Sequence, residues 1–273
     1  DCREDKGRLA AIVEDIRAIK PDLIYTFGTT VTACITGTVN TECTECIRDI
    51  PIVFNIVADP VGAGLVPDLR GSGRNITGVS HLVPLKAQLK AMRSVIDFKK
   101  LAIIYNPEEQ NSQLTAEELE SLARTGGFTL IKKPVHPELL RSADQNAFCE
   151  IADAMAHANA ELIYLPSDSL VISNTQKLLE AINQRNIPTF SATEMPIREA
   201  DAFMGLVGKY YTMGQFAAYK AEQVLDGIDI RTIPIETLKR FSFIINMKTA
   251  KKIGVYPPIP LLKFAEVIVD EKY

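Results

Sequence analysis

The stretch PDLIYTFGTT, residues 21–30, carries the pattern on which the fold class depends. Leu23 to Phe27 is a short apolar run with aromatic and β-branched residues, which predicts a buried strand. Pro21 ends the helix before this run, and Gly28-Thr29-Thr30 predicts a turn into a second helix that a threonine can cap. A helix, a buried strand and another helix in direct succession are typical of a parallel sheet with helices on both faces.

The same alternation extends over the rest of the chain. Apolar residues at helical spacing predict helices, and short apolar runs between them predict strands. The further predicted strands lie at residues 52–57, 101–105, 128–131, 162–165, 188–191 and 241–245, with 202–207 as a strand or a crossover. The predicted helices lie around residues 9–19, 85–96, 115–124, 148–155, 175–185 and 213–225. We therefore expect an α/β protein with parallel sheets.

The alternation starts again after about residue 81, which predicts two Rossmann-like lobes joined by crossover strands. The length of 273 residues agrees, because it exceeds the usual size of a single α/β domain. We expect an N-terminal lobe of residues 1–80 plus 203–236 and a C-terminal lobe of residues 81–202 plus 237–273. The extended piece Ile76–Ser80 is predicted to pass from one lobe to the other.

The chain is acidic, with a formal net charge of −4. Nucleic acids and anionic membrane surfaces require a basic face, so we expect neither as a partner. The sequence has only three histidines, which is few for a metal site or for acid–base catalysis. No apolar run is long enough to cross a bilayer. The first residues are charged and show no signal segment, and a mature or trimmed chain would look the same.

Polar side chains follow five of the predicted strands at the point where each strand ends. The five clusters are Gly28-Thr29-Thr30, Asp59-Pro60, Asn106-Pro107, Ser167-Asp168-Ser169 and Ser191 to Glu194. Ligands of parallel sheets bind outside the carboxyl ends of the strands, so the set predicts one shared cleft between the lobes. The same residue types are also ordinary caps and turn residues of such loops, so each position taken alone has a structural interpretation too.

Cysteines offer three further interpretations. Cys43-Thr44-Glu45-Cys46 has the spacing of a redox motif, but it follows a helix instead of opening one after a strand. Together with Cys34 it supplies three of the four ligands that a zinc site needs. A structural disulfide among these three residues is the interpretation that we favour, and it fits an oxidising compartment.

Several stretches resemble the family of ABC transporter substrate-binding proteins associated with uptake of tryptophan, tyrosine and other aromatic amino acids. The most specific of them are Asp59-Pro60-Val61-Gly62-Ala63-Gly64-Leu65-Val66 and Asn75-Ile76-Thr77-Gly78-Val79-Ser80. Others are residues 21–29, 51–54, 105–107, 167–169, 210–214 and 246–254. The resemblance covers nearly the whole chain in order. It departs from the family at the Cys43–Cys46 insert and at the start, where family members have one more strand and helix.

The resemblance implies a periplasmic-binding-protein fold of type I and a receptor that hands a small solute to a membrane permease. It implies a periplasmic or lipid-anchored protein outside the cytoplasm, a monomer, with no cofactor and no catalysis. The pocket candidates that it carries over are Thr29, Thr30, Asp59, Asn106, Asp168, Glu194 and Tyr211. Alternatives on the same fold are a sensory binding module and a repressor core, although the latter would need a DNA-binding motif that this chain lacks. An enzyme that uses Cys43 and Cys46 for redox or metal chemistry is less favoured.

If the solute is an amino acid, each of its three parts has candidate partners. Its carboxylate would bind the helix start at Thr29 and Thr30. Its ammonium would pair with Asp168 or Glu194. Its side chain would pack on tyrosines, because the sequence has no tryptophan. The candidate tyrosines are Tyr105, Tyr164 and Tyr211.

Overall fold

The computed structural model describes residues 6–40, 43–142 and 144–269, and it divides the chain into two compact units. Unit 1 runs to Leu82 and includes Gly208–Arg240, whereas unit 2 consists of Val83–Val207 and the chain from Phe241 onward. Both units are α/β with mostly parallel strands, which confirms the expected fold class.

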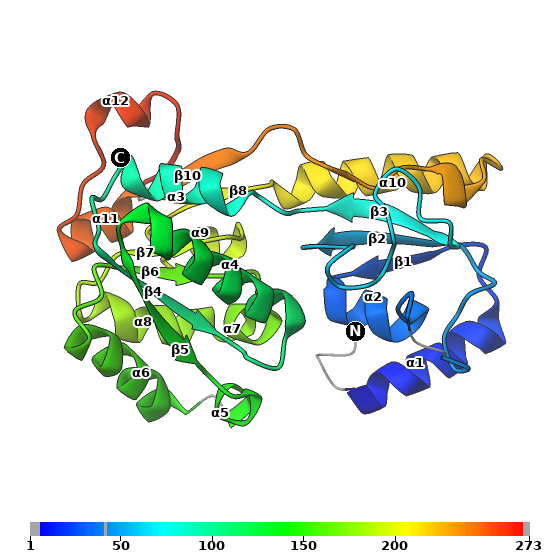
Figure 1. Ribbon diagram of the computed structural model, residues 1–273, viewed down its shortest axis with the longest axis horizontal. Coiled ribbons are helices and arrows are strands. Elements are labelled where there is room, and N and C mark those ends of the chain that lie inside the picture. The colour runs from blue at the N-terminus through cyan, green and yellow to red at the C-terminus, as the bar shows by residue number, and fades with distance from the viewer. Residues whose placement is uncertain (1–5, 41–42, 143, 270–273) are drawn as a thin grey trace. The chain divides into compact units, whose positions relative to one another are not determined.

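Unit 1 is a four-stranded parallel sheet in the order β1-β2-β3-β9, with helices on both faces (Figure 1). Its elements are α1 (Lys6–Ile19), β1 (Ile24–Phe27), α2 (Thr29–Thr36), β2 (Ile52–Val57), β3 (Ile76–Ser80), α10 (Tyr210–Leu225), the 3-10 turn Ile230–Thr232 and β9 (Glu236–Thr237). Every residue of β2 and β3 is buried, because one apolar core lies under α1 and α2 and a second lies under α10.

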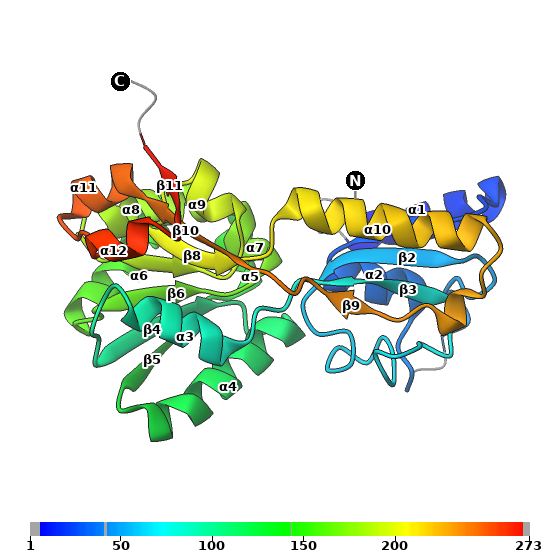
Figure 2. The same cartoon turned by 90° about the horizontal axis from the view of Figure 1, so that it is seen from above.

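Unit 2 contains a seven-stranded sheet in the order β11-β10-β8-β7-β6-β4-β5, in which β8 and β10 form the antiparallel pair. Its strands are β4 (Lys100–Tyr105), β5 (Thr129–Pro134), β6 (Leu162–Leu165), β7 (Thr189–Ser191), β8 (Met204–Val207), β10 (Ser242–Asn246) and β11 (Glu266–Ile268). Its helices are α3 (Leu85–Arg93), α4 (Gln110–Gly126), α5 (Pro137–Ser142), α6 (Gln145–His157), α7 (Ser169–Ser173), α8 (Thr175–Asn183), α9 (Met195–Glu199), α11 (Met247–Ile253) and α12 (Ile259–Leu262). Figure 2 shows α3 and α4 along one side of the sheet, where they cover one of two large cores.

The chain passes between the units at other places than the sequence pattern predicts. β8 pairs with β7 and β10, so residues 203–207 belong to unit 2 and not to the N-terminal lobe. Residues 237–240 stay in unit 1, because β9 pairs with β3. The piece Ile76–Ser80 is an inner strand of unit 1, with β2 on one side and β9 on the other. Apolar runs of four or five residues do not reveal which sheet they join, because their burial is the same in both.

A disulfide joins Cys43 and Cys46, whose Cα atoms lie 5.4 Å apart, in agreement with the favoured interpretation, although an oxidised redox pair would form the same bond. Two of the three sulfurs that a zinc site would use are therefore taken, and the described residues contain no cluster of three or more possible metal ligands. Cys34 lies on α2 outside the disulfide, and its carbonyl oxygen is 4.0 Å from the Cys46 sulfur. The Cys46 sulfur also packs closely against Gly37, because a Cβ atom at position 37 would lie 2.9 Å from it.

The end of α2 is held by Arg74, which comes from the loop before β3. Its guanidinium donates to the carbonyl oxygens of Thr36 at 2.6 Å, Gly37 at 3.2 Å and Leu65 at 2.5 Å. The last carbonyl groups of a helix have no partner within the helix, so Arg74 satisfies groups that would otherwise need water. It thereby fixes α2 against the loop that follows β2.

We predict that Arg74→Met lowers the free energy of unfolding by about 1–3 kcal/mol, because three carbonyl groups lose a charged donor. Arg70→Met is the matched control. Its side chain is 91% exposed and pairs with Asp68 alone, so its removal should have a much smaller effect. Urea unfolding followed by circular dichroism measures both. Equal losses in the two variants would contradict the role of Arg74.

Candidate functional site

In unit 1 the structure brings Thr29 to the end of β2. Its hydroxyl accepts a hydrogen bond from the backbone N–H of Ala58 at 3.4 Å, directly before Asp59. Gly28 has φ 86°, a left-handed conformation that allows β1 to pass straight into α2. Thr30 follows with an exposed side chain. The first N–H groups of α2 therefore start beside the end of β2, which is the arrangement that binds anions.

Asp59 shapes the turn that follows β2. Its Oδ1 atom accepts a hydrogen bond from the backbone N–H of Gly62 at 2.9 Å. A Cβ atom at Gly62 would lie 2.2 Å from Asp59 Oδ2, so a larger residue there would displace the Asp59 carboxylate from this position. Asp59 is thus at the predicted edge of the sheet, partly exposed, and one of its oxygens is used to fix the turn.

A strained bulge precedes this turn. The pairing of β2 with β3 shifts register between Phe54 and Val57, and Ile56 has φ 56°, which is unusual for a β-branched residue. The side chain of Asn55 supports the bulge by accepting from the N–H of Ile56 and donating to the hydroxyl of Tyr25, both at 2.9 Å. Such strain concentrates at functional sites. In the sequence this bulge is marked only by an asparagine inside an apolar strand, and the sequence analysis did not interpret that asparagine as a sign of a bulge.

Two aromatic side chains meet where β1 ends and α10 begins. Phe27, the last residue of β1, is 51% exposed and makes an edge contact with Tyr210 at 6.2 Å between ring centroids. Tyr211 is the second residue of α10 and is 78% exposed. Tyr164, expected as a possible packing partner for a solute, is instead a core residue of unit 2 that stacks on Phe190. Its burial raises its pKa and removes it from any surface.

In unit 2 the structure brings Asn106 and Asp168 together at the ends of β4 and β6. The backbone N–H of Asn106 donates to Asp168 Oδ2 at 2.6 Å, and the N–H of Val171 donates to Oδ1 at 2.9 Å. Asp168 is fully buried and caps α7. Its burial raises its pKa, although these N–H groups act in the opposite direction. Both of its oxygens are occupied by the backbone.

Glu194 lies at the start of α9, and its carboxylate already has a cationic partner. Its Oε1 atom is 2.6 Å from Nε of Arg198, and the same guanidinium also pairs with Glu266. Asp168 and Glu194, the two expected partners of a solute ammonium, are therefore both engaged within unit 2.

A third carboxyl group, Glu109, was not among the predicted residues. It follows β4 and accepts hydrogen bonds from the N–H of Ser169 at 2.9 Å and from its hydroxyl at 3.2 Å. Burial raises the pKa of Glu109 to about 7, and the negative charge of Asp168 adds to this. The available signal was its position three residues after Asn106, in the loop that follows a predicted strand.

The sequence matches the family model of ABC transporter substrate binding proteins over residues 1–269. The chain belongs to this family. It is 27% identical over 260 residues to the Tyrosine-binding protein of Clostridioides difficile (strain R20291), covering 93% of this chain and 69% of that protein. Among solved structures, a conserved domain protein from Vibrio cholerae has a TM-score of 0.84 at 26% identity, covering 97% of this chain and 84% of that one. The ABC domain in complex with L-Trp from Streptococcus pneumoniae has a TM-score of 0.83 at 22% identity, with the same coverage.

These similarities confirm the expected periplasmic-binding-protein type of fold for this substrate-binding protein. No helix within the described residues is both long and apolar enough to span a membrane.

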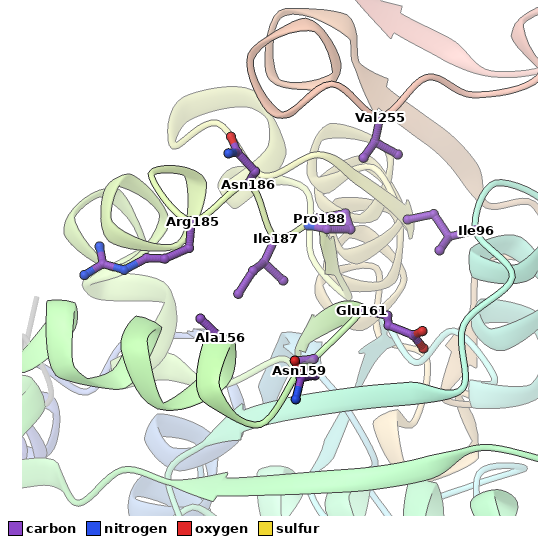
Figure 3. Close-up of a pocket in the computed structure, with 10 residues that line it drawn as sticks. Ile96, Ala156, Asn159, Glu161, Arg185, Asn186, Ile187, Pro188 and Val255 are labelled. Atoms are coloured by element: carbon purple, nitrogen blue, oxygen red, sulfur yellow. The ribbon is translucent and has the colours of Figure 1, made fainter.

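A hollow of about 500 Å³ in unit 2 lies at the opposite ends of the strands, next to the residues that precede β6 and β7. In Figure 3 the side chains of Arg185 and Glu161 extend away from each other there. Arg185 pairs with Asp153 at 2.9 Å, and Glu161 accepts from the N–H groups of Lys99 and Lys100. Because its charges already have partners, this hollow of the substrate-binding protein is a poor place for a polar solute.

His81 is buried directly after β3, and its backbone N–H donates to the carbonyl oxygen of Val57. Burial lowers its pKa from 6.5 to about 4. Between these two pH values the unfolded chain binds more protons at this residue than the folded chain does. Its contribution to stability is therefore present above about pH 6.5 and is lost as the pH falls toward 4.

We predict that His81 makes the protein about 2 kcal/mol less stable at pH 5 than at pH 7.5. His81→Gln should remove this part of the pH dependence, whereas His157→Gln, a change on the exposed end of α6, should leave it unchanged. Denaturant unfolding at several pH values provides the comparison. Glu109 acts in the opposite direction, so the informative quantity is the difference between wild type and variant at each pH. An unaltered profile in His81→Gln would disprove the prediction.

Proposed function

We propose that this protein is the extracytoplasmic solute receptor of an ABC importer, and that its solute is an amino acid with an aromatic or other apolar side chain. The observation that carries the proposal is the arrangement at one sheet edge of unit 1. There Phe27 directly precedes the start of α2 at Thr29 and Thr30, and its ring contacts Tyr210 at the start of α10, where Tyr211 follows. An anion site beside aromatic surface is complementary to the carboxylate and side chain of such an amino acid.

Two relatives support this choice of solute. The Clostridioides difficile relative is a tyrosine-binding protein, and the Streptococcus pneumoniae structure contains L-Trp. In this chain the solute carboxylate would be bound by the N–H groups of α2 and the hydroxyl of Thr30, while Tyr211 would cover the side chain. Asp59 remains a proposed ligand-binding residue of unit 1, and Asn106, Asp168 and Glu194 remain proposed ligand-binding residues of unit 2. The engaged carboxylates of Asp168 and Glu194 favour an indirect role, in which they hold the loops in place.

The remaining functional proposals follow from the family. A substrate-binding protein of an ABC importer hands its solute to a permease in the membrane and makes or breaks no covalent bond in it. The Cys43–Cys46 disulfide supports a location outside the cytoplasm, periplasmic or lipid-anchored, because disulfides persist in oxidising compartments. A monomer that needs no cofactor is sufficient for this role.

A panel of solutes tests the proposal. We expect L-tryptophan, L-tyrosine or L-phenylalanine to raise the melting temperature, because a ligand at 100 times its dissociation constant adds about 2.7 kcal/mol of stability. Tryptamine lacks the carboxylate and indole-3-propionate lacks the ammonium, so both should bind at least tenfold more weakly. Stabilisation by sugars or nucleobases and by none of the amino acids would refute the proposal.

Tyr211 can be tested separately from the threonines. Tyr211→Ala should weaken binding of the aromatic solute about five- to tenfold, as expected for one lost ring contact. Tyr219→Ala is the matched control, because Tyr219 is on the same helix and is 54% exposed. Calorimetric titration of both variants gives the comparison. A similar loss in both, or in neither, would remove Tyr211 from the site.

A further inference from the structure

Residues 247–265 of unit 2 carry a charge opposite to that of the chain as a whole. This segment contains four lysines and no aspartate or glutamate, whereas the formal net charge of the chain is −4. Its lysines are all exposed, at positions 248, 251, 252 and 263. Lys248 lies 3.5 Å from Asp201, and in the part of the chain that the structure describes the other three form no ion pair. The expectation that this acidic chain avoids anionic membranes rested on its net charge, so it does not apply to this segment.

The same segment exposes three large apolar side chains. Phe264 is 84% exposed, more than any other large apolar residue that the structure describes, and Ile259 is 78% exposed. Tyr256 is exposed as well, four positions after Lys252. Exposed apolar side chains that occur as a group mark interaction surfaces. We define the α11–α12 surface by its three lysines without an ion pair and these three apolar residues: Lys251, Lys252, Tyr256, Ile259, Lys263 and Phe264.

The backbone of this surface is held in place by the fold. Leu261 and Leu262 of α12 pack on an apolar core of unit 2, and α11 packs on the same core. The N–H of Phe264 donates to the carbonyl oxygen of Leu261 at 3.0 Å, which ends the helical turn. In Figure 1 α12 projects from unit 2 above β10. With the two leucines directed inward, Ile259 and Phe264 are presented on the outside of the turn.

Two kinds of partner are complementary to exposed lysines and apolar side chains, an anionic lipid bilayer and an acidic protein segment. The composition of the surface favours the bilayer. Lysine is depleted at the buried centre of protein–protein interfaces. Lysine together with phenylalanine or leucine is instead typical of segments that lie in a membrane interface, where apolar side chains enter the acyl boundary and the ammonium groups stay among the phosphates. The neighbours Lys263 and Phe264 have this combination, and both are exposed.

We propose that the α11–α12 surface binds the protein reversibly to anionic phospholipid bilayers. Ile259 and Phe264 enter the boundary between headgroups and acyl chains, while the lysines remain at the level of the phosphates. Electrostatic attraction acts over roughly 8 Å at physiological ionic strength, so the lysines of α11 contribute without being inserted. Few apolar side chains are buried, so the association is weak and depends on salt. The inference does not depend on which solute the protein binds.

The sequence has no tryptophan, so a single introduced tryptophan reports on membrane contact. Phe264→Trp places it in the proposed contact, and Tyr219→Trp places it at an exposed position of unit 1 as the control. The full chain is mixed with vesicles of phosphatidylcholine alone or of equal parts phosphatidylcholine and phosphatidylglycerol. We expect a blue shift of the emission for Phe264→Trp with the anionic vesicles only, and its loss at high salt. Tyr219→Trp should show no shift.

Vesicle flotation of chains without tryptophan measures the affinity. The charge variant combines Lys251→Gln, Lys252→Gln and Lys263→Gln. Its matched control removes the same charge from exposed positions outside the surface and combines Lys20→Gln, Lys132→Gln and Lys239→Gln. The charge variant should bind anionic vesicles on the order of 100-fold more weakly, since each lysine near an anionic bilayer contributes about a fivefold factor, whereas the control should change far less. Phe264→Ser should weaken binding about tenfold, because one buried apolar side chain is lost.

Three results would overturn the proposal: no binding to anionic vesicles, equal binding to neutral and anionic vesicles, or equal losses in the charge variant and its control. An emission shift of Phe264→Trp with polyglutamate but with no vesicle would also overturn it, in favour of an acidic protein segment. Flotation of the wild-type chain needs no substitution, so it decides the matter if a variant does not fold. In all these cases the proposed function stands, because the solute-binding groups proposed in unit 1 lie outside this surface.

Discussion

Parallel strand pairing is the constraint on which the rest of this structure depends. In unit 1 the pairing of β1 with β2 and of β2 with β3 brings the carboxyl ends of three strands to one edge. In unit 2 the pairing of β4 with β6 and of β6 with β7 does the same. The loops that carry Thr29, Asp59, Asn106 and Asp168 leave from these two edges. Residues 29 and 62 positions apart, Thr29 with Ala58 and Asn106 with Asp168, are therefore hydrogen-bonded to each other.

The polar residues at these edges perform two different tasks. Asp168 binds backbone N–H groups, Asp59 fixes its own turn, and Glu194 pairs with Arg198. Their polar atoms are used to hold loops in a defined shape. Thr30, Tyr211 and part of Glu109 remain accessible, and these are the groups that can meet a solute. A precise site needs both kinds, because side chains that contact a ligand must themselves be held in position.

The sequence was sufficient to predict most of the strands and the edges at which the loops lie, because these follow from local periodicity. It placed the starts of α1, α4, α6 and α10 three to five residues late, and it did not predict the short strands β9 and β11. It was insufficient at three places, each of which depends on contacts between distant residues. The partner sheet of β8 is one, since its short apolar run fits either core. The bulge at Ile56 is another, because it is a register shift between β2 and β3, and one of the hydrogen bonds that support it joins Asn55 to Tyr25. The third is the choice among carboxylates, because loop residues Asp168 and Glu109 look alike until their hydrogen-bond partners are known.

Two titratable groups with shifted pKa values, the buried His81 and the partly buried Glu109, make the stability of the molecule respond to pH in opposite directions. His81 is held neutral by burial, so acidification destabilises the folded chain between about pH 6.5 and pH 4. Glu109 has a raised pKa, so its contribution is fully present below about pH 4.5 and is lost as the pH rises through about 7. At neutral pH the histidine is therefore in its preferred state, whereas the carboxyl pair of Glu109 and Asp168 is not.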